Sequence, residues 1–258
     1  MNSRVVSVLI GGFLCLPGVA SPELTGSITA AAKPSSAARV VKSNAAVSST
    51  TARAAALMSE TVAVQSGVSP KVLNLAVSAL TCAVNAGDIA VPRTLTVIDY
   101  SLPSVEPRLW VFDVATGELL FKELVAHGRN TGENMATRFS DTLNSRQSSI
   151  GLFVARDTYV GSNGYSLRLD GLEPGFNGRA RERAIVMHGA PYVDESLAKS
   201  QGRIGRSWGC PALREAVARN VIDTVRGGGV IFSYYPDQTW LNTSHFLNCD
   251  QPAVLATN

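Results

Sequence analysis

Charged and aromatic side chains are scarce in this 258-residue chain, at 17% and 7% of the residues. The 23 Lys and Arg residues slightly outnumber the 20 Asp and Glu residues, and they are scattered along the sequence. Binding to nucleic acid phosphates requires clustered positive charge, so we expect no nucleic-acid partner. Hydrophobic residues make up 45% of the chain, which is enough for a core, and the length predicts one folded domain.

Long apolar runs are also absent, and the one short run lies at the N-terminus. Arg4 precedes an apolar stretch over 5–16, and small residues at 18–20 (Gly-Val-Ala) offer a cleavage site. The stretch is shorter than the roughly 20 residues that span a bilayer, so a membrane anchor is the weaker alternative. We therefore interpret 1–20 as a signal peptide and expect an exported protein of the periplasm or cell envelope, without a membrane span.

Large side chains are rare over residues 21–56, which consist mainly of Ala, Ser, Thr and Val. Such a segment buries too little apolar surface to offset the entropy lost on ordering, so we predict a disordered tether. The folded domain is expected over 57–250, followed by a tail over 251–258. We expect this domain to be a monomer.

Within 57–250 the sequence predicts mostly β-structure with peripheral helices. Ser69 suits the N-cap and Pro70 the first position of a helix that Gly87 ends. A second helix is predicted over 211–225, ended by the glycines at 227–229. Runs rich in β-branched and aromatic residues predict strands at 95–100, 108–114, 118–126, 149–155, 165–169, 183–188 and 228–235, with a hairpin turn at 115–117.

Cysteine and histidine are few as well, with four and three residues. Cys210 stands in the glycine-flanked turn "GRSWGCPAL", an unusual place for a buried structural thiol. His188 ends a predicted strand in "VMHG", which can place its imidazole at the rim of a sheet. A free thiol is only a few per cent thiolate at neutral pH, so an imidazole that takes its proton would activate it as an ion pair.

The predicted 211–225 helix would assist the same chemistry. If Cys210 lies at its start, the positive end of the helix dipole favours the thiolate. Backbone N–H groups at that end could also stabilise an oxyanion.

Spacing alone leaves other interpretations open. Cys210 could form a disulfide in an exported protein. Zinc is disfavoured because the sequence has no Cys-x-x-Cys or His-x-x-x-His cluster. Trp208 would ordinarily be a packing residue, and His127 either sits at the site or merely ends its strand. A papain-type hydrolase has its cysteine before its histidine, whereas here His188 precedes Cys210.

These segments resemble the catalytic domain of the murein L,D-transpeptidase family. The resemblance covers about residues 69–235, and it is closest to a divergent branch with Ser-Trp-Gly-Cys in place of Ser-His-Gly-Cys. It rests on "VMHGA" and "GRSWGCPAL" and extends to "RLWVFDVATGELLF", "VAHGRNTGENMATRFS", "SSIGLFVA" and "GYSLRLDGLEPGFN". It implies a compact β-sandwich or barrel-like domain with peripheral helices.

The resemblance also implies roles for individual residues. Cys210 would be the nucleophile and His188 the general base, with the Gly189 carbonyl orienting the imidazole. Ser207 and Gly209 would shape the turn and the oxyanion pocket.

Two positions depart from the common family pattern. Trp208 replaces a histidine, and Ala212 replaces an arginine two places after the cysteine. Arg206 is a candidate to supply the missing charge for a substrate carboxylate. Trp208 and His127 are further candidates for substrate contact.

The implied reaction is acyl transfer on peptidoglycan stem peptides. The Cys210 thiolate would cleave the bond between an L-centre and D-alanine and form a thioester, which an amine of a neighbouring stem peptide resolves into a cross-link. Resolution by water would make the protein an L,D-carboxypeptidase. A non-catalytic cell-wall binding module is the alternative of a different class. The reaction requires no metal and no organic cofactor.

The remaining cysteines suggest one disulfide. After removal of the signal peptide three are left, at 82, 210 and 249. Because a nucleophile must be free, the expected pair is Cys82–Cys249. The alternative is two unpaired thiols, with Cys82 buried as a small hydrophobic residue.

Overall fold

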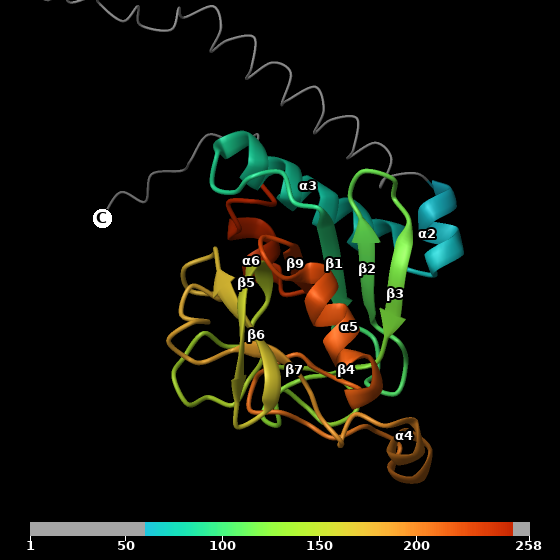
Figure 1. Cartoon of the computed structure of the whole chain (residues 1–258). Helices are drawn as coiled ribbons and strands as arrows, with labels where there is room; N and C mark the ends of the chain where they lie inside the picture. Colours follow the sequence, from blue (N-terminus) through green and yellow to red (C-terminus); the bar gives the residue numbers. More distant parts are fainter. Residues whose placement is uncertain (1–59, 250–258) are drawn as a thin grey trace, which may run out of the picture.

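The computed structural model describes residues 60–249. The predicted signal peptide 1–20, tether 21–56 and tail 251–258 lie outside the described residues. The helices are α2 (Glu60–Ser66), α3 (Pro70–Ala86), α4 (Glu195–Gln201), α5 (Glu215–Val225) and α6 (Gln238–Thr243) (Figure 1). The strands are β1 (Thr94–Asp99), β2 (Leu109–Asp113), β3 (Leu119–Glu123), β4 (Val125–Ala126), β5 (Gly151–Gly161), β6 (Gly164–Gly171), β7 (Val186–Gly189), β8 (Ala212–Leu213) and β9 (Val230–Tyr234).

The described strands form a single sheet, in the order β3-β2-β1-β9-β5-β6-β7-β8-β4. Its two edge strands, β3 and β4, are separated in the chain by Leu124 alone. The sheet must therefore curl until its edges approach each other, as a nearly closed barrel. The predicted mostly β architecture with peripheral helices is confirmed (Figure 1).

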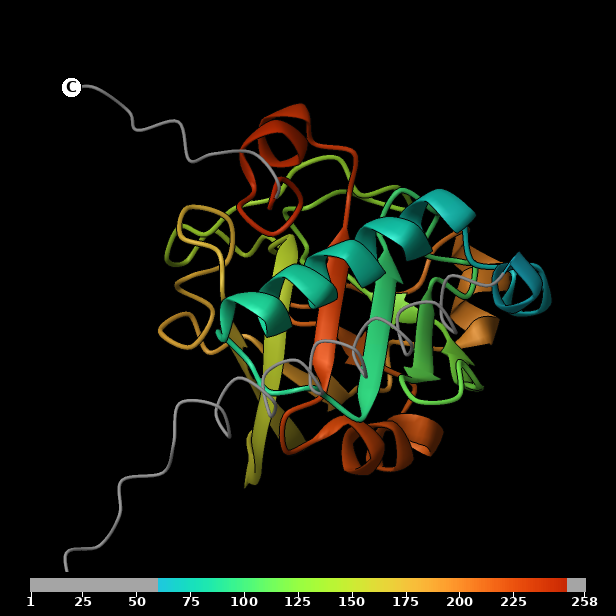
Figure 2. The ribbon, with the colours of Figure 1, turned by 90° about the horizontal axis from the view of Figure 1, so that it is seen from above.

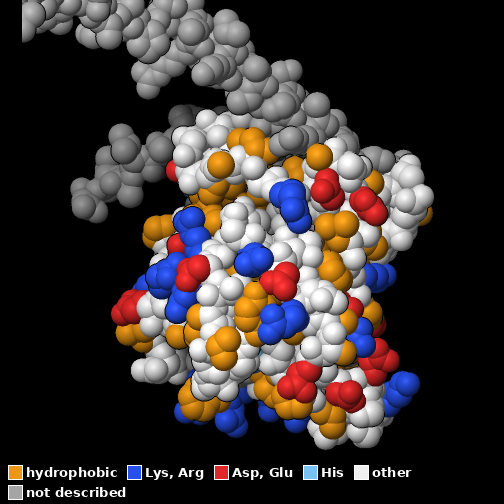
Figure 3. Space-filling model, viewed as in Figure 1, with side chains coloured by type: hydrophobic (Ala, Val, Ile, Leu, Met, Phe, Trp, Pro, Cys, Tyr) orange, Lys and Arg blue, Asp and Glu red, His pale blue; other side chains and the backbone are white. Residues whose placement is uncertain are grey.

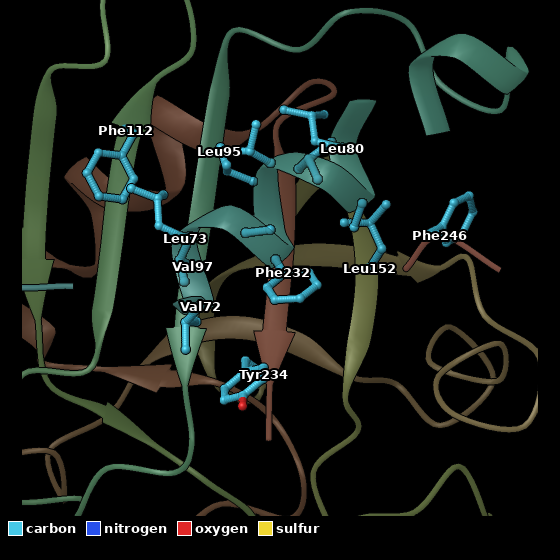
Figure 4. Close-up of a cluster of buried hydrophobic side chains, with 14 of the residues drawn as sticks. Val72, Leu73, Leu80, Leu95, Val97, Phe112, Leu152, Phe232, Tyr234 and Phe246 are labelled. Atoms are coloured by element: carbon cyan, nitrogen blue, oxygen red, sulfur yellow. The ribbon is translucent and has the colours of Figure 1, made fainter. Parts of the chain in front are cut away.

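Helix α3 covers one face of this sheet and lies across β5, β9 and β1 (Figure 2). It begins at Pro70, and Gly87 ends it in a left-handed conformation with φ of 84°. Ser69 occupies the N-cap, although its side chain makes no capping hydrogen bond. The apolar face of the helix contributes Leu73 and Leu80 to a buried cluster with side chains from the strands beneath (Figure 4).

A second core occupies the opposite face of β1, because neighbouring residues of a strand point to opposite faces. Ile98 of β1 belongs to this core, together with Met187 of β7 and Val221 and Ile222 of α5. Helix α5 packs closely on the end of β7. A Cβ atom on Gly189 would lie 3.0 Å from the Cβ of Ala218, so glycine permits this approach.

The predicted helix over 211–225 starts four residues late, at Glu215. Ala212 and Leu213 instead form β8, which pairs with both β7 and β4. Pairing on both sides satisfies their backbone groups, and both side chains are buried. Cys210 therefore does not lie at the start of a helix, and the expected contribution of the helix dipole is wrong.

Several predicted strands also have different boundaries, and the run at 149–155 becomes β5, which continues to Gly161. The run at 118–126 is divided at Leu124 into β3 and β4, which lie at opposite edges of the sheet. The run at 183–188 becomes a strand only from Val186, because Ala184 adopts a left-handed conformation with φ of 53°.

Side chains of both charges are interspersed over the face seen in Figure 3. None of the helices within residues 60–249 combines the length and the apolar character that crossing a membrane requires.

The predicted Cys82–Cys249 disulfide is confirmed, with the two Cα atoms 5.9 Å apart. Cys82 is buried on α3, and Cys249 follows α6 in the last described turn. The bridge ties the C-terminal segment to the helix that covers the first core. Among the described cysteines, Cys210 is free.

We expect the double variant Cys82→Ala/Cys249→Ala to be less stable by about 4–5 kcal/mol, because the bridge closes a long loop in the unfolded chain. Urea unfolding of the double variant and of wild type, with and without reductant, measures this difference. Reductant should lower the free energy of unfolding of wild type but not that of the double variant. Alkylation of Cys82 and Cys249 in denatured, unreduced wild type would contradict the bridge.

Candidate active site

The turn that carries Cys210 is fastened to the segment after β4. The Ser207 N–H donates to the His127 carbonyl at 2.9 Å, and the Arg129 N–H donates to the Ser207 carbonyl at 2.8 Å. The Ser207 hydroxyl donates to the Cys210 carbonyl at 2.7 Å and accepts the Gly209 N–H at 3.0 Å. Ser207 therefore holds both ends of the turn.

Gly209 is required by the shape of this turn. Its φ is 128°, and a Cβ there would lie 2.7 Å from the Gln147 carbonyl oxygen. The Ser148 hydroxyl donates to the Gly209 carbonyl at 3.1 Å. Because the Gly209 N–H already donates to Ser207, this amide is not free to stabilise an oxyanion.

The Cys210 thiol lies against the start of β7. Its Sγ is 3.5 Å from the Val186 N–H and 3.7 Å from the Ala184 carbonyl oxygen. Burial raises the pKa of Cys210, while the Val186 amide and the charge of Arg183 act in the opposite direction. Since a carbonyl oxygen only accepts, the Ala184 contact is that of a protonated thiol.

His188 is held in one orientation at the end of β7. Its Nδ1 lies 2.9 Å from the Gly189 carbonyl oxygen, the contact expected of a base oriented by that carbonyl. Because the carbonyl accepts, Nδ1 carries the hydrogen and Nε2 keeps its lone pair. Burial lowers the pKa of His188, against a smaller opposite effect of the Gly189 hydrogen bond. The imidazole is therefore neutral and has the tautomer that a general base needs.

Strand pairing brings these two residues to neighbouring strands. His188 pairs with Ala212 in the parallel β7–β8 ladder, and Cys210 lies beside Val186, two residues before His188. No hydrogen bond within residues 60–249 joins the thiol to the imidazole. Burial raises the pKa of Cys210 and lowers that of His188, which favours the neutral form of both groups at rest, so the expected ion pair stays a prediction.

Trp208 is not a packing residue, because 69% of its surface is exposed. The Arg146 guanidinium lies over its ring, 4.6 Å from the centroid. The indole therefore stands at the surface two residues before the thiol, where a substrate can reach it.

Arg206 is already bound within the described structure. Its Nη1 donates to the Gly132 carbonyl at 2.9 Å and to Glu133 Oε1 at 2.6 Å. Because Glu133 neutralises its charge, we do not retain Arg206 as the group that binds a substrate carboxylate.

His127 is a buried residue beneath the turn. Arg108 Nη2 lies 2.8 Å from its Nδ1, and its Nε2 lies 3.3 Å from the Gly132 carbonyl oxygen. Burial, and then the charge of Arg108, lower the pKa of His127 to about 4. Its backbone carbonyl accepts the Ser207 N–H, and its ring is fully buried against Arg108 and Gly132, so we interpret the ring as structural support.

A family model for the L,D-transpeptidase catalytic domain matches residues 64–234, more than half of the chain. The chain belongs to this family. The expected L,D-transpeptidase-like fold is thereby confirmed. The histidine-glycine strand end and the Ser-Trp-Gly-Cys turn both lie inside the matched region.

Solved structures similar to this L,D-transpeptidase domain have low sequence identity. The L,D-transpeptidase from Mycobacterium smegmatis is 18% identical, over 55% of this chain and 59% of that chain, with a TM-score of 0.36. L,D-transpeptidase 1 of Mycobacterium tuberculosis is 17% identical over 55% and 62%, with a TM-score of 0.32. The helical cell shape determining protein of Campylobacter jejuni is 10% identical over 60% and 55%, with a TM-score of 0.38. The chain thus covers less than two thirds of each, and no curated protein matches it.

Arg183 is a supporting residue of this candidate site that sequence reasoning missed. Its guanidinium is buried, and it donates to the Ser140 and Gln147 carbonyls, both at 2.6 Å. It fixes the 140–149 segment, which in turn holds Gly209. In "GRARERA" it has the same appearance as exposed arginines at 179 and 181, so the sequence gives no signal for it.

Proposed function

We propose that this domain is a cysteine acyltransferase that acts on peptidoglycan stem peptides. The observation that supports this best is the arrangement of Cys210 and His188. The free thiol lies beside β7, the strand that carries His188, whose Nε2 is unprotonated and whose Nδ1 is held by the Gly189 carbonyl. A nucleophile and an oriented base on a rigid sheet are the components of covalent acyl transfer.

The first half of the reaction forms a thioester. Cys210 Sγ attacks the carbonyl carbon between an L-centre and D-alanine, while His188 Nε2 accepts the thiol proton. The C–N bond then breaks, and the imidazolium returns that proton to the leaving amine of D-alanine. The step balances without a cofactor, and its products are free D-alanine and an acyl group on Cys210.

The second half releases the enzyme. An amine of a neighbouring stem peptide attacks the thioester, His188 takes a proton from it, and the Cys210 thiol is regenerated by that proton. The product is a cross-link. If water attacks in place of the amine, the product is a shortened stem peptide, and the protein is an L,D-carboxypeptidase.

Peptidoglycan lies outside the cytoplasmic membrane, so the proposal requires export. The N-terminal sequence over 1–20 supports it, because a charged residue, an apolar run and small residues follow one another as in signal peptides. The Cys82–Cys249 disulfide supports it further, since such bonds persist in oxidising compartments.

Incubation of the purified protein with tetrapeptide muropeptides, followed by mass spectrometry, tests this proposal. We expect loss of D-alanine with a cross-linked dimer as the main product. A shortened monomer without dimer would identify the carboxypeptidase. Binding to peptidoglycan with no D-alanine release would identify a non-catalytic wall-binding module and contradict the proposal.

A further inference from the structure

One pocket beside the thiol concentrates unusual backbone conformations. Three residues other than glycine have positive φ within residues 60–249: Asn144 at 57°, Arg146 at 55° and Ala184 at 53°. All three line the same pocket, which has a volume of about 590 Å³. Asparagine tolerates this conformation, whereas arginine and alanine adopt it at a cost, and such residues cluster at functional sites.

This pocket shares one of its lining residues, Ala184, with the surroundings of the nucleophile. The carbonyl oxygen of Ala184 lies 3.7 Å from Cys210 Sγ, and Trp208 forms another part of the pocket wall. A ligand in the pocket is therefore separated from Cys210 Sγ by the Ala184 wall, close enough for its chemistry to bear on which substrates the thiol can attack.

Arg146 provides the pocket with a cation that has no acidic partner. Its guanidinium lies 4.6 Å from the centroid of the exposed Trp208 ring, and none of the ion pairs within residues 60–249 includes it. Glu182, the acid of the pocket, pairs with Arg179 at 2.9 Å. The other cation, Arg183, is buried and already bound to backbone carbonyls.

The backbone around Arg146 is held before any ligand arrives. The Asn130 N–H donates to the Arg146 carbonyl at 3.1 Å, and the Asn130 side chain donates to the Ser145 carbonyl at 2.9 Å. The indole of Trp208 then supports the guanidinium by a cation–π contact. This combination leaves the donor edges of Arg146 free in the pocket.

We propose that Arg146, supported by Trp208, binds the C-terminal carboxylate of the donor stem peptide. The proposal rests on the function proposed above and names the feature of the substrate that the site recognises. A guanidinium presents paired donors that match a carboxylate. Only one residue, D-alanine, separates the attacked carbonyl carbon from that carboxylate, so a carboxylate bound in this pocket keeps the attacked bond near the thiol. Arg146 thus has the role that the sequence suggested for Arg206.

The first test compares tetrapeptide muropeptides that have either a free or an amidated C-terminus. Wild type should prefer the free acid. In Arg146→Gln, KM for the free acid should rise roughly tenfold or more, with little change for the amide, since a hydrogen bond to a charged group is lost. Arg146→Lys should retain part of the preference. Arg219→Gln is the matched control, because Arg219 lies over Tyr165 at 4.2 Å on α5, away from the pocket.

The second test does not depend on turnover. Cys210 is alkylated with iodoacetate, which is anionic, and with iodoacetamide, which is neutral. The rate with iodoacetate divided by the rate with iodoacetamide should fall in Arg146→Gln and stay unchanged in Arg219→Gln. A fall in this ratio without D-alanine release by wild type would refute the proposed function but support the carboxylate site. An unchanged ratio and an unchanged preference in Arg146→Gln would overturn the inference, as would equal turnover of both peptides by wild type.

Discussion

Replacement of Cys210 by alanine should abolish D-alanine release from tetrapeptide muropeptides, with a fall on the order of 10⁴-fold or more, as for other covalent catalysts that lose their nucleophile. Alanine leaves no atom in place of Sγ that can attack a carbonyl. The turn should survive, because Ser207 is bonded to the backbone of Cys210 and not to its thiol. Liquid chromatography of released D-alanine, alongside circular dichroism, measures both properties.

The matched control is Cys82→Ala/Cys249→Ala, which removes the other two described cysteines and leaves Cys210. Assayed below its own unfolding temperature, it should keep the wild-type rate, because the bridge joins α3 to the C-terminal segment and does not contact the thiol. Cys210→Ser keeps an atom at the γ position but replaces the thiol by a hydroxyl. It should also be inactive, which would show that the reaction needs the thiol itself. Normal turnover in Cys210→Ala would exclude this residue as the nucleophile.

Local sequence signals were sufficient where short-range physics decides the structure. Pro70 and Gly87 mark the two ends of α3 correctly, because proline suits the first turn and glycine suits a left-handed end. The helix expected over 211–225 failed at its start for the opposite reason. Ala212 and Leu213 are good helix formers, yet pairing with β7 and β4, which are distant in sequence, makes them a strand.

The same distinction applies to the candidate site. Cys210 and His188 could be proposed from the sequence because each lies in a short continuous segment, "GRSWGCPAL" and "VMHGA". The conformations of Arg146 and Ala184 depend on contacts between separate loops, so no local sequence pattern indicates them. The exposure of Trp208 likewise follows from how the turn at 205–210 meets its neighbours. The sequence therefore indicated the candidate nucleophile and base but not the pocket near them.

Replacement of His188 by alanine should lower the rate at neutral pH by about 10²–10⁴-fold, because the thiol loses its base. Burial lowers the pKa of His188, so in wild type the imidazole is already neutral at pH 7 and ready to accept a proton. The wild-type rate should rise with pH only on the acid side, as His188 loses its proton, and then remain level through neutrality.

The variant should have a different pH profile, which distinguishes loss of a base from structural damage. Without His188, only the thiolate fraction of Cys210 can react, and burial raises the pKa of this thiol. Below that pKa the thiolate fraction grows about tenfold for each pH unit, so the residual rate should climb steadily from about pH 6 to 8. Initial rates of D-alanine release over this range provide the test. A residual rate that is level with pH would mean that His188 positions other groups and does not accept the proton.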